Sequence, residues 1–369
     1  MIEYIRDAQC GADRGGSVGT VVQFVGTRRV EVVETADQPL EPGSVRVATL
    51  YSGISAGTEL TAYRGTNPYL TRTWDEQRRL FVPGDAAPRY PMAGWGYSEV
   101  GVVREVSSDV AGQPGVPAVD DVVWGIWGHR SEAVVPAAKL TGHTIPPGLD
   151  PLAATFARVG AVALNAVLAA ELHLGEVAVV FGQGVIGLLA TRLATLSGAR
   201  VLACDAIPAR LEKATEFRAV AAVDVRTASP AELARSITEG RGADVALELS
   251  GNHLALHEAI RSVAVGGRVV AAGFYQGDGI GLRLGEEFHH NRVELVCSQI
   301  GGPPPRLAGR WDQERMNRTF LTLAAEGMVD PVALVTHRVR VPEGVAAAYE
   351  LLDRRPGEAL QVVLDYTED

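Results

Sequence analysis

The chain has 369 residues, with 34 basic and 44 acidic side chains and a formal net charge of −10. This length predicts two domains or one large one, and a hydrophobic fraction of 47% is ample for a packed core. The acidic balance argues against a nucleic-acid partner held by phosphate contacts and against a basic membrane-surface protein. The three cysteines form no C-x-x-C pair, and no apolar run reaches the roughly 18 residues of a membrane helix. Without a signal-peptide pattern, we expect a soluble, cytoplasmic protein whose partner is a small molecule.

The first 150 residues contain short alternating runs that Gly and Pro interrupt, a pattern typical of β-strands joined by turns. The runs predicted to be strands are residues 21–25, 44–50, 97–106, 121–126 and 132–136. Residues 66–91 are polar and weakly periodic, so we predict a long loop there, which in a compact domain is usually functional or mobile. The Gly- and Pro-containing connector at 141–151 predicts a domain boundary near residue 150.

From residue 151 onward, apolar runs alternate with helical segments. A long Ala-rich helix is predicted at 151–174, and the apolar runs follow at 177–181, 200–204, 220–225, 245–249, 268–272 and 293–297. Continuous apolar strands that alternate with helices predict a parallel sheet covered on both faces, and six of them match a doubly wound nucleotide-binding domain at 151–300. The tail, 301–369, is too short for a separate domain and is predicted to return to the first one.

The strongest chemical signal is a G-x-G-x-x-G stretch between an apolar run and a helix. It consists of Gly182, Gln183, Gly184, Val185, Ile186 and Gly187. The first Gly permits a tight turn, the second lets the backbone approach a pyrophosphate, and the third lets the helix pack on the strand. The N–H groups and positive dipole end of the helix then hold the phosphates. The stretch therefore predicts a dinucleotide site rather than a merely structural turn.

The next strand ends at Asp205, whose carboxylate can accept hydrogen bonds from ribose hydroxyls and would repel a 2′-phosphate. This favours NAD(H) over NADP(H), although Arg210 either offsets part of the repulsion or is only a solvated helix residue. Ligands bind beyond the carboxyl ends of parallel strands, so two later strand ends are further candidates unless they are ordinary turns. Their residues are Ser250, Gly251, Ala272, Gly273 and Phe274.

These features resemble the medium-chain dehydrogenase/reductase superfamily over nearly the whole chain. YSGISAGTELTAYRG at 51–65 is similar to the family's segment with a zinc-binding Cys before G-T-D. PMAGWGYSEVGVV at 91–103 and GHRSEAVVPAA at 128–138 are similar to its G-H-E stretch and its G-x-A-E-Y-V-x-V-P element. The resemblance implies an α/β protein with a GroES-like β-barrel catalytic domain at 1–150, a Rossmann domain, and a homodimer formed through the Rossmann domain.

The chain departs from the family's pattern at the zinc ligands. Ser55 and Ala56 stand where the Cys is expected, and Trp95 and Gly96 where the His and Glu of G-H-E are expected. The third ligand, expected at 158–162, and the four-cysteine structural zinc loop are missing too. The resemblance thus implies no catalytic zinc, and hydrogen-bond donors would polarise a carbonyl oxygen instead. The GISAGTE stretch is most similar to the zinc-free branch that includes bacteriochlorophyllide dehydrogenase-like proteins.

Hydride transfer belongs to the nicotinamide, so the protein must position the substrate and handle one proton. The candidates for the proton are Thr58, Glu59, Tyr63 and His129. Thr58 stands at the family's proton-relay position, and the ordinary pKa of a His suits proton transfer. Each candidate also has a structural interpretation, as a turn Thr, a supporting carboxylate, a packed Tyr and a loop His.

Four residues are candidates for the substrate site: Ser55, Trp95, Arg306 and Trp311. Trp95 would fill the vacated metal space as an apolar wall, and the Arg306–Trp311 loop would recognise a phosphate or carboxylate unless it is a solvated loop.

The main hypothesis is a zinc-independent oxidoreductase that transfers a hydride between NAD(H) and a secondary alcohol or ketone of a small, polar or anionic metabolite. One alternative is an NAD(P)H-dependent enoyl or quinone reductase, the usual activity of many zinc-free relatives. A second alternative is a non-catalytic nucleotide-binding protein.

Overall fold

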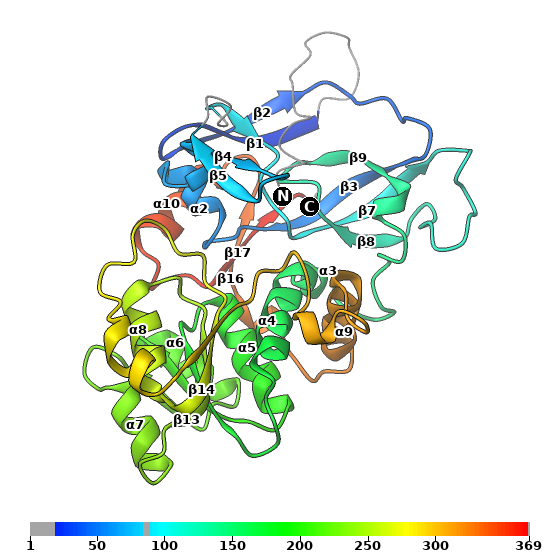
Figure 1. The fold of residues 1–369 in the computed structure, drawn as a ribbon. Helices are drawn as coiled ribbons and strands as arrows, with labels where there is room; N and C mark the ends of the chain where they lie inside the picture. The colour runs from blue at the N-terminus through cyan, green and yellow to red at the C-terminus, as the bar shows by residue number, and fades with distance from the viewer. Residues whose placement is uncertain (1–18, 84–88, 368–369) are drawn as a thin grey trace. The chain divides into compact units, whose positions relative to one another are not determined.

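The computed structural model describes residues 19–83 and 89–367, which fall into two compact units (Figure 1). Unit 1 comprises Met1–Ala157 and Val332–Asp369, and unit 2 comprises Arg158–Pro331. The return to unit 1 therefore begins at Val332, whereas the sequence predicts it at 301. Residues up to 331 stay in unit 2, where the ring of Phe320 packs directly on the backbone of Gly160.

Unit 2 contains a six-stranded parallel sheet in the order β12-β11-β10-β13-β14-β15. Its strands are β10 (Val177–Phe181), β11 (Arg200–Asp205), β12 (Ala221–Asp224), β13 (Ala243–Glu248), β14 (Val263–Ala271) and β15 (Glu294–Cys297). Every residue of β10 is buried, as expected for a strand with helices on both faces. The predicted doubly wound α/β fold is confirmed.

Helices flank the sheet of unit 2 on both sides (Figure 1). They are α4 (Ala157–Ala170), α5 (Val185–Leu196), α6 (Pro208–Glu216), α7 (Pro230–Ile237), α8 (His253–Ser262) and α9 (Gln313–Ala325), with short turns η3 (Leu284–Phe288) and η4 (Pro305–Leu307). Ala234 of α7 and Ile260 of α8 pack on one face, against Val179 and Phe181 of β10. The strand order reverses direction between β10 and β13, which is where ligands bind in folds of this kind.

Unit 1 is built mainly from antiparallel strands. The larger sheet has the order β16-β17-β3-β7-β8 with β9 also on β3, and a smaller sheet has the order β2-β1-β6. These strands are β1 (Gly19–Gly26), β2 (Arg29–Thr35), β3 (Ser44–Gly53), β6 (Met92–Ala93), β7 (Glu99–Val106), β8 (Val122–Gly125), β9 (Glu132–Pro136), β16 (Val335–Arg340) and β17 (Gln361–Asp365). Strand β17 pairs with β3, so the C-terminal return completes this sheet.

The helices described in unit 1 are short. Over residues 19–83, 89–157 and 332–367 they are α2 (Glu59–Arg64), α3 (Pro151–Ala154) and α10 (Val345–Arg354), with turns η1 (Pro68–Leu70), η2 (Ala137–Lys139) and η5 (Val332–Leu334). The helix predicted at 151–174 is divided into α3 and α4. Within the described residues, no helix combines the length and the apolar character needed to span a membrane.

The prediction of a long loop at 66–91 is wrong for most of the described residues in that range. Residues in it form η1 and a two-stranded hairpin of β4 (Arg72–Asp75) and β5 (Leu80–Pro83). The rings of Trp74 and Phe81 face each other across the hairpin with centroids 5.1 Å apart, and Tyr69 packs on Phe81 at the same separation. Such aromatic cross-strand pairs stabilise a hairpin even where charged residues hide the alternation.

Candidate functional site

The glycine stretch of unit 2 forms the turn between β10 and α5. Gly182 has φ +86°, and a Cβ on it would stand 2.8 Å from the backbone nitrogen of Ser250. A Cβ on Gly187 would overlap the carbonyl oxygen of Gly182, so the third Gly is needed for the helix to approach the strand. A Cβ on Gly184 would have a guanidinium nitrogen of Arg210 as its nearest neighbour, 4.0 Å away. The middle glycine therefore leaves an open cradle at the N-terminus of α5, where a pyrophosphate would fit.

Asp205 lies at the end of β11, beside this turn. Its Oδ2 accepts a hydrogen bond from the backbone N–H of Gln183 at 2.6 Å, and its Oδ1 accepts one from Ile207 at 2.9 Å. Arg210 approaches the same carboxylate, with its Nη1 4.0 Å from Oδ2. The Gln183 side chain is buried and donates to the carbonyl of Val180, so only its backbone faces the turn. The structure thus holds the acidic group predicted to bind ribose against the predicted phosphate loop.

The ends of β13 and β14 meet at a buried carboxylate that the sequence did not single out. Glu248 is fully buried and accepts hydrogen bonds from the backbone of Ser250 at 2.8 Å and of Gly251 at 3.1 Å. The hydroxyls of Ser250 and Tyr275 donate to it as well. Burial raises the pKa of Glu248 above its ordinary value.

The predicted residues after β14 lie at the same place. The backbone N–H groups of Ala272 and Gly273 donate to the carbonyl of Glu248 at 2.9 and 3.0 Å, and the Phe274 side chain is exposed. Both predicted strand ends therefore lie at the carboxyl edge of the sheet that carries the glycine turn.

Unit 1 contains a fully buried chain of polar side chains. The Nε2 of His129 lies 2.7 Å from Oε2 of Glu59, and its Nδ1 lies 2.5 Å from Oγ of Ser52. Ser52 donates to Glu99 at 2.9 Å, and the hydroxyl of Tyr349 donates to Glu59 at 2.7 Å. Two predicted proton-transfer residues, Glu59 and His129, are thus brought together, and both are 0% exposed.

Both ring nitrogens of His129 have an oxygen partner in this chain, Oγ of Ser52 on Nδ1 and a carboxylate oxygen of Glu59 on Nε2. The imidazole is thus held between two polar groups that fix the orientation of its ring. Burial alone would lower the pKa of His129, but the adjacent Glu59 carboxylate outweighs it and raises that pKa. Burial raises the pKa of Glu99.

The loop before α2 joins this buried chain to the surface. The second oxygen of Glu59 accepts the backbone N–H of Ser55 at 2.8 Å, while the Ser55 hydroxyl is hydrogen-bonded to that of Tyr97. Ser55 and Thr58 are partly exposed, and Thr58 directs its backbone N–H to Oγ of Ser55 at 3.5 Å. Sequence reasoning missed Tyr97, which stands two residues beyond Trp95.

Tyr63 and Trp95 lie in the apolar core of unit 1. The ring of Phe24 is 6.1 Å from that of Tyr63 and 6.1 Å from that of Trp95, and Tyr349 packs on both Phe24 and Tyr63. Tyr63 is 5% and Trp95 8% exposed. These placements favour a packing role for Tyr63 over proton donation. They place Trp95 in the core, and its predicted role as an apolar wall of the substrate site stays a prediction.

The basic loop predicted to bind an anionic substrate belongs to unit 2. The exposed guanidinium of Arg306 lies 3.4 Å from a carboxylate oxygen of Glu171. The Trp311 ring is covered by the guanidinium of Arg315, 4.2 Å from the ring centre. Arg306 and Trp311 thus already have partners within the chain, and their predicted substrate role stays a prediction.

One group of possible metal donors occurs among the described residues, at His257, Glu286 and Glu287. The guanidinium of Arg283 donates to Nε2 of His257 at 2.8 Å. This neighbouring positive charge opposes a cation, so the group does not alter the expectation that the chain has no metal site.

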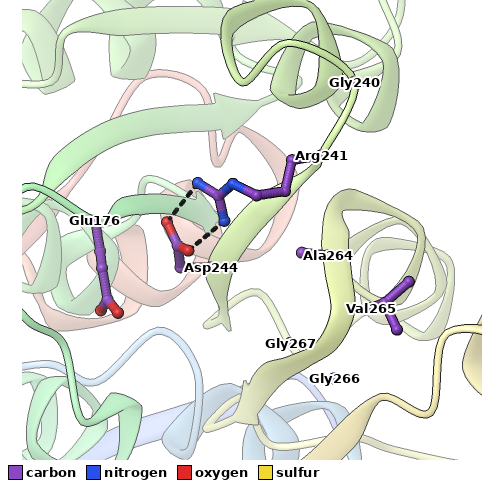
Figure 2. Close-up of a pocket in the computed structure, with 8 residues that line it drawn as sticks. All are labelled: Glu176, Gly240, Arg241, Asp244, Ala264, Val265, Gly266 and Gly267. Atoms are coloured by element: carbon purple, nitrogen blue, oxygen red, sulfur yellow. Dashed lines mark hydrogen bonds and ion pairs between the residues drawn. The ribbon is translucent and has the colours of Figure 1, made fainter.

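A pocket of about 570 Å³ opens at the opposite edge of the unit 2 sheet (Figure 2). Glu176 precedes β10, and Asp244 is the second residue of β13, with its carboxylate bridged by the two terminal guanidinium nitrogens of Arg241. The five residues of β10, roughly 17 Å at ~3.3 Å per residue, separate this pocket from the glycine turn. The pocket is therefore distinct from the predicted cofactor contacts.

Comparisons with known proteins find dehydrogenases that share this fold. The fold is that of the medium-chain dehydrogenase/reductase superfamily. Residues 185–312, which lie in unit 2, match the family model described as zinc-binding dehydrogenase.

Comparison with individual relatives gives alignments that cover most of the chain, beyond the residues that the family model matches. D-guloside 3-dehydrogenase of Escherichia coli (strain K12) is 28% identical over 344 residues, which cover 91% of this chain and 96% of the relative. The sorbitol dehydrogenase of Halalkalibacterium halodurans is 29% identical over 60% of this chain and 61% of its own length. The solved structure of alcohol dehydrogenase TADH from Thermus sp. ATN1 superposes with a TM-score of 0.74 at 25% identity, covering 94% of this chain and 99% of that one.

Proposed function

We propose that this chain is an NAD(H)-linked oxidoreductase that interconverts a secondary hydroxyl group and a ketone on a sugar derivative or polyol, without catalytic zinc. The observation that carries the proposal is the Asp205 carboxylate, held 2.6 Å from the backbone N–H of Gln183 inside the glycine turn.

The cofactor assignment rests on the fit of unit 2 to a dinucleotide. Gly182, Gly184 and Gly187 leave backbone exposed at the N-terminus of α5 for the pyrophosphate, and Asp205 offers acceptors to the adenosine ribose. A bound nicotinamide would supply or accept the hydride. The Asp205 charge supports NAD(H) over NADP(H), because a 2′-phosphate beside it would be repelled.

The substrate class rests on the relatives. A D-guloside 3-dehydrogenase matches over 96% of its length, and a sorbitol dehydrogenase matches over 61%. Both names describe oxidation of one hydroxyl among many. We transfer the class, a sugar derivative or polyol, and not the individual compound.

The absence of catalytic zinc is proposed from the chemistry of the available donors. Protein zinc sites use Cys sulfur, His nitrogen or a carboxylate. At the expected Cys position, the hydroxyl of Ser55 is bonded to that of Tyr97, and at the expected His position Trp95 offers only an indole N–H. The nearby imidazole and carboxylate, His129 and Glu59, have both nitrogens and both oxygens occupied by hydrogen bonds. These residues do not fit the metal that the family model's description implies.

The proposal is tested with purified protein treated exhaustively with a chelator. We expect NADH to bind, and a panel of polyols and glycosides with NAD⁺ to contain at least one substrate whose turnover is unchanged by metal removal. Turnover that needs stoichiometric zinc would refute the zinc-free part. Reduction of activated alkenes or quinones, with no alcohol oxidised, would favour the enoyl or quinone reductase alternative. NADH binding without any turnover would favour a non-catalytic protein.

A further inference from the structure

The two residues predicted to handle the proton do not reach the surface of unit 1. Glu59 and His129 are 0% exposed, and every polar atom of their side chains is already hydrogen-bonded. A substrate could touch them only if the core opened. Another group therefore has to meet the substrate oxygen.

The hydroxyl pair of Ser55 and Tyr97 lies at the surface end of this buried chain. Ser55 is partly exposed and is followed by exposed Ala56 and Gly57. Tyr97 is a buried residue that keeps 9% exposure, against 0% for Glu59 and His129, so the accessible side of the pair is that of Ser55. The two hydroxyls share a hydrogen bond, and either one can be the donor. Ser55 stands where the sequence resemblance expects the zinc-binding Cys, and Tyr97 stands two residues beyond Trp95, which occupies the position of the expected His.

The buried chain fixes the position of this pair. Glu59 accepts the backbone N–H of Ser55 at 2.8 Å, and His129 and Tyr349 hold Glu59 from its other oxygen. The backbone N–H of Thr58 points at the Ser55 hydroxyl from the loop, at 3.5 Å. Glu59 and His129 are therefore positioning residues that act through Ser55.

We propose that Tyr97 and Ser55 are the groups that bind the substrate oxygen and transfer the proton, an inference that rests on the proposed dehydrogenase function. With Ser55 as the donor within the pair, the phenolic proton of Tyr97 is the one offered to the substrate oxygen, where it stabilises the negative charge that develops. Each hydroxyl is both a donor and an acceptor, so the pair serves both directions of the reaction.

In the direction of ketone reduction, the carbonyl carbon gains the hydride and the C=O π bond breaks. The oxygen takes the phenolic proton of Tyr97, and the alcohol is complete. The phenolate then takes the proton of the Ser55 hydroxyl, which recovers one from water at the partly exposed loop. Alcohol oxidation runs through the same transfers in reverse and releases one proton to water.

The test replaces Tyr97 by Phe, which keeps the ring and removes only the hydroxyl. We expect kcat to fall by roughly a hundredfold or more, the usual contribution of a positioned acid or base, with an unchanged Kd for NADH. Tyr69→Phe is the matched control, since Tyr69 lies in η1 away from the pair, and it should retain full turnover. Thermal unfolding of both variants checks that the fold is intact.

Ser55→Ala provides a second, independent measurement. It should lower kcat by roughly tenfold and change the solvent deuterium isotope effect on kcat, because the proton relay to water is broken. This variant carries the test if Tyr97→Phe does not fold. A Tyr97→Phe enzyme within threefold of wild-type kcat, or a Ser55→Ala enzyme with the wild-type rate and isotope effect, would overturn the inference while leaving the proposed function standing. If the wild-type protein oxidises no alcohol with NAD⁺, the proposed function fails and this inference fails with it.

Discussion

At the scale of single residues, the candidate sites depend on carboxylates whose environments differ sharply. Asp205 is 9% exposed and has a guanidinium nitrogen of Arg210 4.0 Å from its Oδ2, whereas Glu99 is 1% exposed. The first carboxylate is the one predicted to bind a ligand. The second is bound by Ser52 and by the backbone N–H of Trp127, 3.0 Å from its Oε2.

Asp205→Asn tests the ribose assignment without deleting the acceptor that holds the glycine turn. The amide keeps one oxygen for the backbone N–H of Gln183 and gives up the bond from Ile207, and it removes the negative charge that would repel a 2′-phosphate. We expect the ratio of NADH to NADPH affinity to fall roughly tenfold, since charged hydrogen bonds exceed neutral ones by about 1 kcal/mol or more. Fluorescence titration of both cofactors measures the ratio. An unchanged ratio in a folded variant would remove Asp205 from cofactor selection.

Glu99→Gln tests the buried carboxyl through the pH dependence of stability. Burial raises the pKa of Glu99 above its ordinary 4.5, so the folded state binds this proton more tightly than the unfolded state. The free energy of unfolding should therefore fall as the pH rises from about 4.5 through the folded-state pKa. Gln resembles the protonated acid, because it can accept from Trp127 and donate to Ser52, and it should remove this part of the slope.

Urea unfolding at a series of pH values measures that slope. Glu343→Gln is the control, since Glu343 is an exposed residue of unit 1 and should leave the pH dependence as in the wild type. Identical pH profiles for wild-type protein and Glu99→Gln would contradict the raised pKa.

At the scale of elements, the segment that leads into β7 is shaped around the buried polar chain. Gly96 has φ +113°, and a Cβ there would stand 2.6 Å from Oε1 of Glu99 and 2.9 Å from the His129 ring. The glycine thus permits both the backbone conformation and the close approach of the segment to His129.

Gly96→Ala should lower the free energy of unfolding by roughly 3 kcal/mol, because it adds a steric overlap to backbone strain. Gly112→Ala separates the two effects, since Gly112 has φ +76° and nothing within 4 Å of a Cβ. That control should lose only about 1 kcal/mol. Chemical denaturation compares them, and equal losses in the two variants would show that Gly96 is required for its backbone conformation alone.

Helices and strands with a strong hydrophobic pattern were predictable from the sequence. The hairpin held together by contacts between its two strands was not. The apolar runs of β10, β11 and β13 are buried on both faces and continuous, so they and their helices were found. The hairpin of β4 and β5 was missed because Arg and Glu interrupt its alternation, and its stability comes from cross-strand rings such as Trp74 and Phe81.

The same distinction separates the two sites. The predicted cofactor contacts lie in one continuous motif and at the ends of strands, and both are features that local sequence pattern indicates. The partners of Glu59 come from positions far apart in sequence, with His129 70 and Tyr349 290 residues away. Local spacing carries no signal for such contacts, so Ser52, Glu99 and Tyr349 were not foreseen.

At the scale of the whole molecule, the two units differ in how the chain builds them. Unit 2 is one continuous segment with its own sheet and core. Unit 1 needs the C-terminal return, because β17 pairs with β3, and α10 supplies Tyr349 to Glu59 and Asp353 to Arg64. Its core also includes Leu352 and Val362 from that return.

A fragment of residues 155–331 should consequently fold alone and bind NADH, since it contains all of the sheet, the glycine turn and Asp205. A fragment of residues 1–157 should not fold, because β3 would have an unpaired edge and the carboxylate of Glu59 would lose its bond from Tyr349 inside the core. Circular dichroism, cooperative thermal unfolding and NADH fluorescence distinguish the two outcomes. The Asp205→Asn change in the 155–331 fragment should alter the ratio of NADH to NADPH affinity as it does in the full chain.

Two outcomes would contradict these expectations. A cooperatively folded 1–157 fragment would show that the C-terminal return is dispensable for the core of unit 1. A 155–331 fragment that folds without binding NADH would show that the contacts at the carboxyl edge of its sheet are insufficient for cofactor binding.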